Sequence, residues 1–103
     1  MTAIVLTERE TDEGTLVALC DEDVIGETFE NGEVSLTVSE SFYGSEAAEY
    51  DVDVDRVVES LARCATANIV GDRSVDLAIE HGFVEETRVL DLDGTRHAQM
   101  MWL

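Results

Sequence analysis

Cysteine and histidine are the soft metal ligands in this chain, and they can also act as a nucleophile or a general base. They stand at Cys20, Cys64, His81 and His97. No two of them have the short spacing that marks a zinc site or a redox pair, so we expect no metal and no cofactor. Cys20 and His97 are candidate catalytic residues, with His97 as a general base. The alternative for His97 is a packed or hydrogen-bonded side chain in a strand.

An acidic run at residues 51–55 resembles the start of a calcium-binding loop. Such a loop needs glycine at its sixth position and glutamate at its twelfth, and Arg56 and Ala62 stand there instead. We therefore interpret the run as a helix start, where carboxylates lie favourably beside the positive end of the helix dipole.

Residues 68–74 combine side chains suited to binding an anion or a partner. We expect a junction between two helices here, where free N–H groups at the start of the second helix could hold an anion such as phosphate. Arg73 could add a bidentate contact. The alternative is a tight junction in which Asn68 and Ser74 satisfy the helix ends. The candidate anion-binding or partner-binding residues are Asn68, Gly71, Arg73 and Ser74, together with Tyr43.

Alternating and β-branched runs predict the strands. Residues 3–9 and 15–20 predict an opening hairpin. The turn dipeptides Asn31-Gly32 and Asp93-Gly94 predict two further hairpins, because their residues readily adopt positive φ. The pattern of residues 39–50 fits either a helical turn or a loop.

Apolar residues at steps of three and four predict a helix over residues 53–70 that ends at Gly71. A second helix follows from Asp72 to about Gly82. The expected order is four strands, two helices and two strands. We therefore predict a single α+β domain over residues 1–103. It consists of an antiparallel sheet of five or six strands with a two-helix pair packed on one face.

The charge balance is strongly acidic. The chain has 103 residues, and its 24 acidic and 6 basic residues give a formal net charge of −18. All six basic residues are arginine. Acidic residues spread along the whole chain indicate a salt-loaded cytoplasm, where mobile ions screen the self-repulsion. Acidity would otherwise argue against nucleic acid; in such a cell, a few arginines, backbone donors or apolar contacts must hold a partner.

No apolar run is long enough to span a membrane, and the first residues lack the basic and apolar parts of a signal peptide. We therefore expect a cytoplasmic protein with no membrane partner.

Several short segments in collinear order carry a family resemblance. The chain resembles an archaeal domain-of-unknown-function family, number 424 of that series. The family usually has a lysine between the positions of Gly26 and Phe29, and this chain has Glu27 and Thr28 there, which fits a haloarchaeal member. The resemblance implies a fold and a lineage, and an association with genes for translation and RNA processing. The segments are Cys20-Asp21-Glu22-Asp23-Val24-Ile25-Gly26, Phe29 with Gly32, Phe42-Tyr43-Gly44, residues 67–75 and His97-Ala98-Gln99.

Three functions follow as hypotheses. The first is an accessory binding module for RNA or for a translation-factor or ribosomal complex, with an exposed patch at the candidate residues above. The second is a small enzyme or ligand-binding protein, with a pocket at Cys20, Asn68, Arg73 and His97. The third is a structural subunit of a larger assembly, with an exposed apolar patch at Phe83, Met100, Met101 and Trp102.

Overall fold

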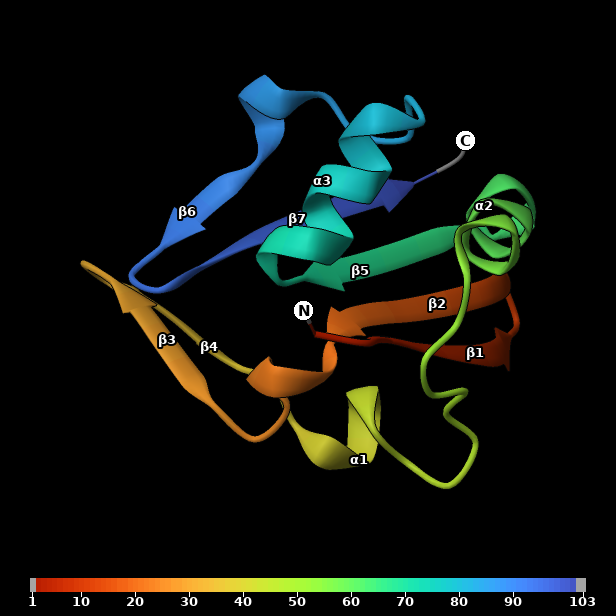
Figure 1. Ribbon diagram of the computed structural model, residues 1–103, viewed down its shortest axis with the longest axis horizontal. Coiled ribbons are helices and arrows are strands. Elements are labelled where there is room, and N and C mark those ends of the chain that lie inside the picture. The colour runs from red at the N-terminus through yellow and green to blue at the C-terminus, as the bar shows by residue number, and fades with distance from the viewer. Residues whose placement is uncertain (1, 102–103) are drawn as a thin grey trace.

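The computed structural model describes residues 2–101 and arranges them as a five-stranded sheet, a separate two-stranded ribbon and short helices (Figure 1). The sheet has the order β1-β2-β5-β7-β6. Its strands are β1 Ile4–Thr11, β2 Gly14–Asp21, β5 Thr66–Val70, β6 Leu90–Leu92 and β7 Thr95–Met101. The ribbon consists of β3 Thr28–Asn31 and β4 Val34–Thr37. The helices are α1 Glu40–Tyr43, α2 Val54–Arg63 and α3 Asp72–Glu80, with 3-10 turns η1 Glu22–Val24 and η2 Glu86–Arg88.

The α+β class is confirmed, but the prediction of a purely antiparallel sheet is wrong. Strands β2 and β5 run parallel, with Leu16 opposite Thr66 and Cys20 opposite Val70. The other pairs are antiparallel. A parallel pair needs a long crossover connection, and the segment that contains the ribbon, α1 and α2 provides it.

The long helix predicted over residues 53–70 is also wrong in its second half. Helix α2 ends at Arg63, and the chain turns at Cys64 into strand β5. The i, i+4 apolar spacing continues by coincidence through Ala65 and Ile69. Because β5 lies between β2 and β7 with Ala67, Ile69 and Val70 buried, it lacks the alternation by which a half-exposed strand is recognised.

The ribbon of β3 and β4 does not join the main sheet, so two of the six predicted strands lie outside it. Its tip is fixed to the β6–β7 turn. The Asn31 side-chain amide donates to the carbonyl of Asp91 at 2.7 Å, and the N–H of Asp93 donates to the carbonyl of Glu30 at 3.2 Å.

Two apolar clusters lie on opposite faces of the sheet. Helices α2 and α3 pack on one face, which we call the helix face, through Val57, Leu61, Val75, Leu77 and Ala78. The opposite face is covered in part by α1, η1 and the ribbon, through Tyr43, Val24, Phe29 and Leu36. The predicted helix hairpin does not form, because β5 separates the two helices in the chain.

None of the helices within residues 2–101 is long and apolar enough to cross a bilayer. The longest, α2, has 10 residues, about half of what a membrane-spanning helix needs.

Candidate functional site

Part of the sheet face opposite α2 and α3 is left open by residues 2–101. Strand register places its side chains next to one another, because directly paired residues point to the same face. Asn68 pairs with Gln99, His97 pairs with Leu90, and Thr66 lies between Leu16 and Met101. All seven side chains are partly or well exposed. We call this surface the open strip: Leu16, Thr66, Asn68, Leu90, His97, Gln99 and Met101.

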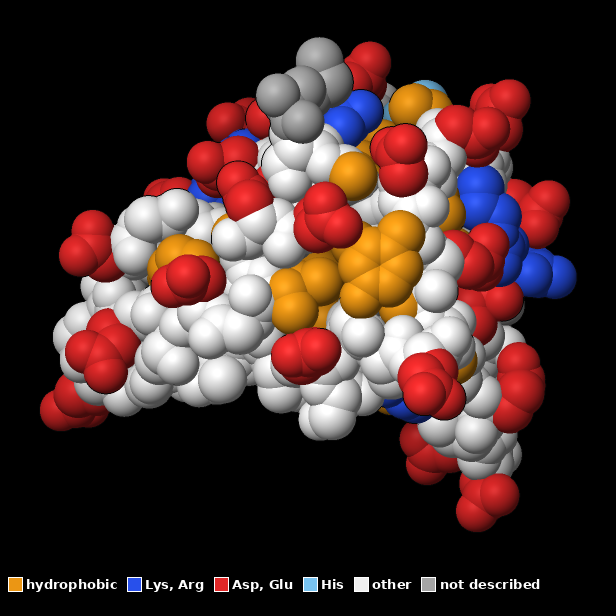
Figure 2. Space-filling view, turned by 60° about the horizontal axis from the view of Figure 1, so that its bottom comes forward, with side chains coloured by type: hydrophobic (Ala, Val, Ile, Leu, Met, Phe, Trp, Pro, Cys, Tyr) orange, Lys and Arg blue, Asp and Glu red, His pale blue; other side chains and the backbone are white. Residues whose placement is uncertain are grey.

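The open strip contains no acidic side chain, although 24 of the 103 residues are Asp or Glu. Acidic side chains are spread over the side of the molecule shown in Figure 2. Within the five strands of the main sheet, every acidic residue points to the helix face: Glu8 and Glu10 on β1, Asp21 on β2 and Asp91 on β6. The side chains that the five strands present on the two faces of the sheet therefore differ sharply in charge.

The polar side chains of the open strip have no partner within residues 2–101. Thr66, Asn68, His97 and Gln99 supply hydroxyl, amide and imidazole groups, and none of these groups forms a hydrogen bond or ion pair with another described residue. Burial lowers the pKa of His97, so its ring is neutral at pH 7 and carries one donor and one acceptor. The donors and acceptors of these partly exposed groups are therefore available to water or to a ligand.

Cys20 lies on the same sheet face as the open strip but is completely buried. Burial, followed by the charges of Asp21, Asp23 and Glu22, raises the pKa of its thiol to about 12. A thiol that stays protonated is a poor nucleophile. Val70 stands between Cys20 and His97 in the register, so the two are two strand spacings apart, roughly 10 Å. The structure therefore does not bring them together as a Cys–His pair.

The segment 68–74 is a strand-to-helix junction, and the predicted helix–helix junction is wrong. Asn68 lies within β5 and Arg73 within α3, with Gly71 at the boundary. Gly71 has φ 111° and ψ 146°, a conformation that is essentially restricted to glycine.

The N–H groups at the start of α3 are held by a carboxylate from the chain itself. Asp21, at the end of β2, is only 4% exposed. Its Oδ2 accepts from the N–H of Arg73 at 3.0 Å, and its Oδ1 accepts from the N–H and hydroxyl of Ser74 at 2.9 and 2.7 Å. Asp21 thus occupies the place predicted for phosphate, and an external anion would have to displace it.

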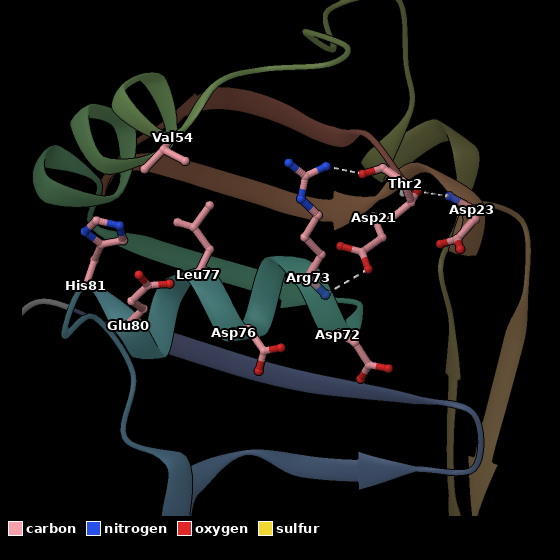
Figure 3. Close-up of a pocket in the computed structure, with 10 residues that line it drawn as sticks. All are labelled: Thr2, Asp21, Asp23, Val54, Asp72, Arg73, Asp76, Leu77, Glu80 and His81. Atoms are coloured by element: carbon pink, nitrogen blue, oxygen red, sulfur yellow. Dashed lines mark hydrogen bonds between the residues drawn. The ribbon is translucent and has the colours of Figure 1, made fainter.

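Arg73 lines an open groove of about 730 Å³ beside α3 (Figure 3). Its guanidinium donates through Nη1 to the carbonyl of Thr2. Within residues 2–101 it forms no ion pair, unlike Arg56, Arg63 and Arg96. The other residues of the groove are Thr2, Asp21, Asp23, Val54, Asp72, Asp76, Leu77, Glu80 and His81. Five of these are carboxylates, so the groove surrounds one cation with negative charge.

The candidate partner-binding residues do not form one exposed patch. Ser74 and Tyr43 are buried, and burial, with a smaller effect of Cys20, raises the pKa of the Tyr43 phenol to about 12. Asn68 and Arg73 are partly exposed but lie on opposite sides of the sheet. The pocket expected at Cys20, Asn68, Arg73 and His97 does not form either. Cys20, Asn68 and His97 lie on one face of the sheet, and Arg73 lies on α3 at the other. Partner binding by Asn68 and Arg73 stays a prediction.

The predicted apolar patch is present only in part. Met101 is 60% exposed, Phe83 is partly buried and Met100 is buried. Trp102 lies outside the described residues. Within residues 2–101, no group of His, Cys, Asp and Glu side chains is arranged to hold a metal ion.

Sequence reasoning missed three residues that organise these sites. Thr66 and Gln99 belong to the open strip, and Asp21 caps α3. The signal for Gln99 was its spacing of two from His97 in a predicted strand, which places both on one face. Asp21 gave no signal, because its partners follow 52 and 53 positions later.

Comparisons with known proteins extend this picture. A family model described as "Protein of unknown function (DUF424)" matches residues 8–103. The chain is similar to a solved structure described as the "Crystal structure of an uncharacterized conserved protein from Methanopyrus kandleri". The identity is 27%, the TM-score is 0.69, and the match covers 95% of this chain and 90% of that chain. The comparison with curated proteins gives no match.

Proposed function

This chain belongs to the DUF424 family of proteins of unknown function, and we propose that it is a cytoplasmic accessory module that binds RNA in a translation or RNA-processing complex. The observation that carries the proposal is the open strip. It is an acid-free sheet face with four polar side chains that lack partners within residues 2–101.

The chemistry of the open strip suits the edges of unpaired bases. Asn68 and Gln99 are paired across β5 and β7, so their two amides lie side by side, each with donors and an acceptor. Amide and imidazole groups read base edges, whereas carboxylates would repel the phosphates. The absence of acidic side chains from the open strip is what allows RNA to approach an otherwise acidic molecule.

The strip offers little positive charge, and this defines how binding should depend on salt. Arg9, opposite Leu16 on β1, is the nearest cation in the register, and its guanidinium stacks 4.7 Å above the Phe42 ring. Binding through about one phosphate contact would lose affinity with salt at a logarithmic slope of only about −0.7. Such binding survives in the salt-loaded cytoplasm that we propose for this chain.

The test is retention of RNA by the tagged protein from a halophilic host, in molar KCl throughout, with RNA and protein identified together. The double variant Asn68→Asp/Gln99→Glu places two carboxylates on the strip with almost no change in shape. Its matched control, Ser35→Glu/Thr87→Glu, adds the same charge at exposed positions outside the strip.

Loss of RNA in the strip variant, with retention in the control, is the expected result. Equal retention by both variants would overturn the strip as the binding surface. Retention of a translation factor that persists after nuclease treatment would identify a protein partner and overturn direct RNA binding.

The groove beside α3 favours a second candidate, a small-ligand protein. Arg73 is a partly buried cation without an ion pair within residues 2–101, next to the apolar side chains of Val54 and Leu77. A small zwitterion could place its carboxylate on Arg73 and its ammonium on the surrounding acids. A metabolite screen by thermal shift tests this: a hit must be lost in Arg73→Gln, and a hit that survives in that variant contradicts the role of Arg73.

A further inference from the structure

The outer edge of β7 is paired along only half of its length. Strand β6 pairs with Thr95, Arg96 and His97 and begins at Leu90, so no strand continues beside residues 98–101. On its inner side, β7 pairs with β5 as far as Met101. A free edge with unpaired main-chain groups is a template for another strand.

The ladder determines which main-chain groups point to the free edge. The N–H of Gly71 donates to the carbonyl of Arg96 at 2.9 Å, so the main-chain groups of Arg96 point toward the β5 side of the strand. Because direction alternates along an antiparallel strand, the main-chain groups of His97, Gln99 and Met101 face outward. His97 meets Leu90 of β6. The N–H and C=O groups of Gln99 and Met101 have no partner within residues 2–101.

This edge opens onto a groove of about 570 Å³ with a mixed lining, in which apolar side chains stand beside Glu85 and Arg88. Phe83 and Val84 form its far wall, and Gln99, Met100 and Met101 form the near side. Met101, whose side chain is 60% exposed, would be covered by a strand laid along β7. The unpaired main chain and the exposed apolar side chain thus lie at one place.

We propose that a second copy of this chain occupies the free edge, with the two β7 strands paired antiparallel about a two-fold axis near Met100. Gln99 of each copy then lies opposite Met101 of the other, and His97 keeps its pairing with Leu90. An antiparallel edge is self-complementary, since each strand supplies the donors and acceptors that the other needs.

Charge also favours this occupant. Each copy carries a net charge of −18, but β7 contains no acidic residue, and Glu85, which lines the groove beside it, is paired with Arg88 at 3.6 Å. Two copies can therefore meet at this edge with little like-charge repulsion.

The pairing also bears on RNA binding. Only this consequence, and not the dimer itself, rests on the proposed function. A two-fold axis between antiparallel edges is perpendicular to the sheet, so both open strips face the same side. The Gln99 side chains of the two copies lie near the axis, and the strips join into one acid-free surface across a continuous sheet. A longer RNA segment can then contact both copies.

The test is sedimentation equilibrium of the RNA-free full chain in molar KCl over a range of protein concentrations. Gln99→Pro removes the outward N–H without removing a bond to β5, and edge positions tolerate proline. Gln99→Thr is the matched control, because it shortens the side chain but keeps the N–H. We expect a dimer for the wild type and Gln99→Thr, and a dissociation constant raised about tenfold or more in Gln99→Pro.

Amide hydrogen exchange of the wild type gives a second readout, which needs no variant and so does not depend on whether Gln99→Pro folds. Exchange at Gln99 and Met101 should slow as protein concentration rises, whereas exchange at Ala98, bonded to β5, should not change. A monomer at all concentrations, or a dimer with unprotected Gln99 and Met101, overturns the proposal. Because no RNA is present, either result leaves the test of the proposed function independent.

Discussion

The carboxylate of Asp21 holds both the main chain and the side chain of Ser74, which stands 53 positions later in the sequence. Its Oδ1 lies 2.9 Å from the Ser74 nitrogen and 2.7 Å from the Ser74 hydroxyl. The end of β2 thereby caps α3, and the two elements that frame the groove of Arg73 are fixed to each other. All of these groups are buried or partly buried, so their loss is not compensated fully by water.

Replacement of Asp21 should destabilise the fold. Asp21→Ala leaves three donors at the start of α3 without an acceptor and should lower the free energy of unfolding by about 2–3 kcal/mol. Asp21→Asn keeps one acceptor oxygen and should cost about 1 kcal/mol. Chemical denaturation in molar KCl measures both. The exposed neighbour Glu22→Gln is the control, and an Asp21→Ala variant as stable as that control would refute the cap.

Gly71→Ala should be more damaging than an alanine at any glycine with open space around it. A Cβ at Gly71 would lie 2.7 Å from Oδ2 of Asp21, and the φ of 111° is strained for other residues. We expect a loss of about 3 kcal/mol or more, from strain and from displacement of Asp21. Gly82→Ala, with φ of 80° and no atom within 4 Å of the added Cβ, should lose only about 1 kcal/mol. Equal losses would contradict the close approach of Asp21 and Gly71.

Glu8 should make stability depend on pH in the acidic range. Burial would raise the pKa of Glu8, but hydrogen bonds from Ser60 and Arg56 and the charges of Arg56 and Arg63 lower it overall. A lowered carboxyl pKa stabilises the fold above the usual value near 4.5, and this contribution is lost as pH falls through the folded value.

Denaturation midpoints between about pH 5 and pH 3 measure this effect. Glu8→Gln should show a shallower fall in stability over that range than the wild type. The exposed control Glu86→Gln should follow the wild type. If all three chains fall in parallel, the contacts of Glu8 do not lower its pKa.

The two thiols should resist modification in the folded protein. Burial raises the pKa of both Cys20 and Cys64 and removes both from solvent. A thiol reagent at pH 8 should label neither residue in the native chain and both after unfolding. Fast labelling of Cys20 in the native chain would contradict its burial and would revive it as a candidate nucleophile.

Local signals predicted the hairpins well. The strands near residues 3–9 and 15–20 are correct, and Asp93-Gly94 connects β6 to β7 with Leu92 opposite Thr95, as expected for a two-residue loop. The ribbon turn lies one residue later than predicted, at Gly32 and Glu33, because Asn31 pairs with Val34 and its side chain is held by Asp91.

Features set by distant contacts were not predictable in the same way. Strand β5 is a strand because β2 and β7 flank it, and its own residues carry helical spacing. The cap from Asp21 and the division of Asn68 and Arg73 between two faces follow from that placement. The open strip could be found only after β5 and β7 were paired, since its residues come from four strands.

Amide chemical-shift mapping shows where on the protein RNA binds. The labelled protein would be titrated in molar KCl with a mixed-sequence single-stranded RNA. If RNA binds on the open strip, shift changes occur at Thr66, Asn68, His97 and Gln99. They are lost in Asn68→Asp/Gln99→Glu and kept in Ser35→Glu/Thr87→Glu. Changes confined to the groove of Arg73, or no changes at saturating RNA, would contradict binding on the open strip.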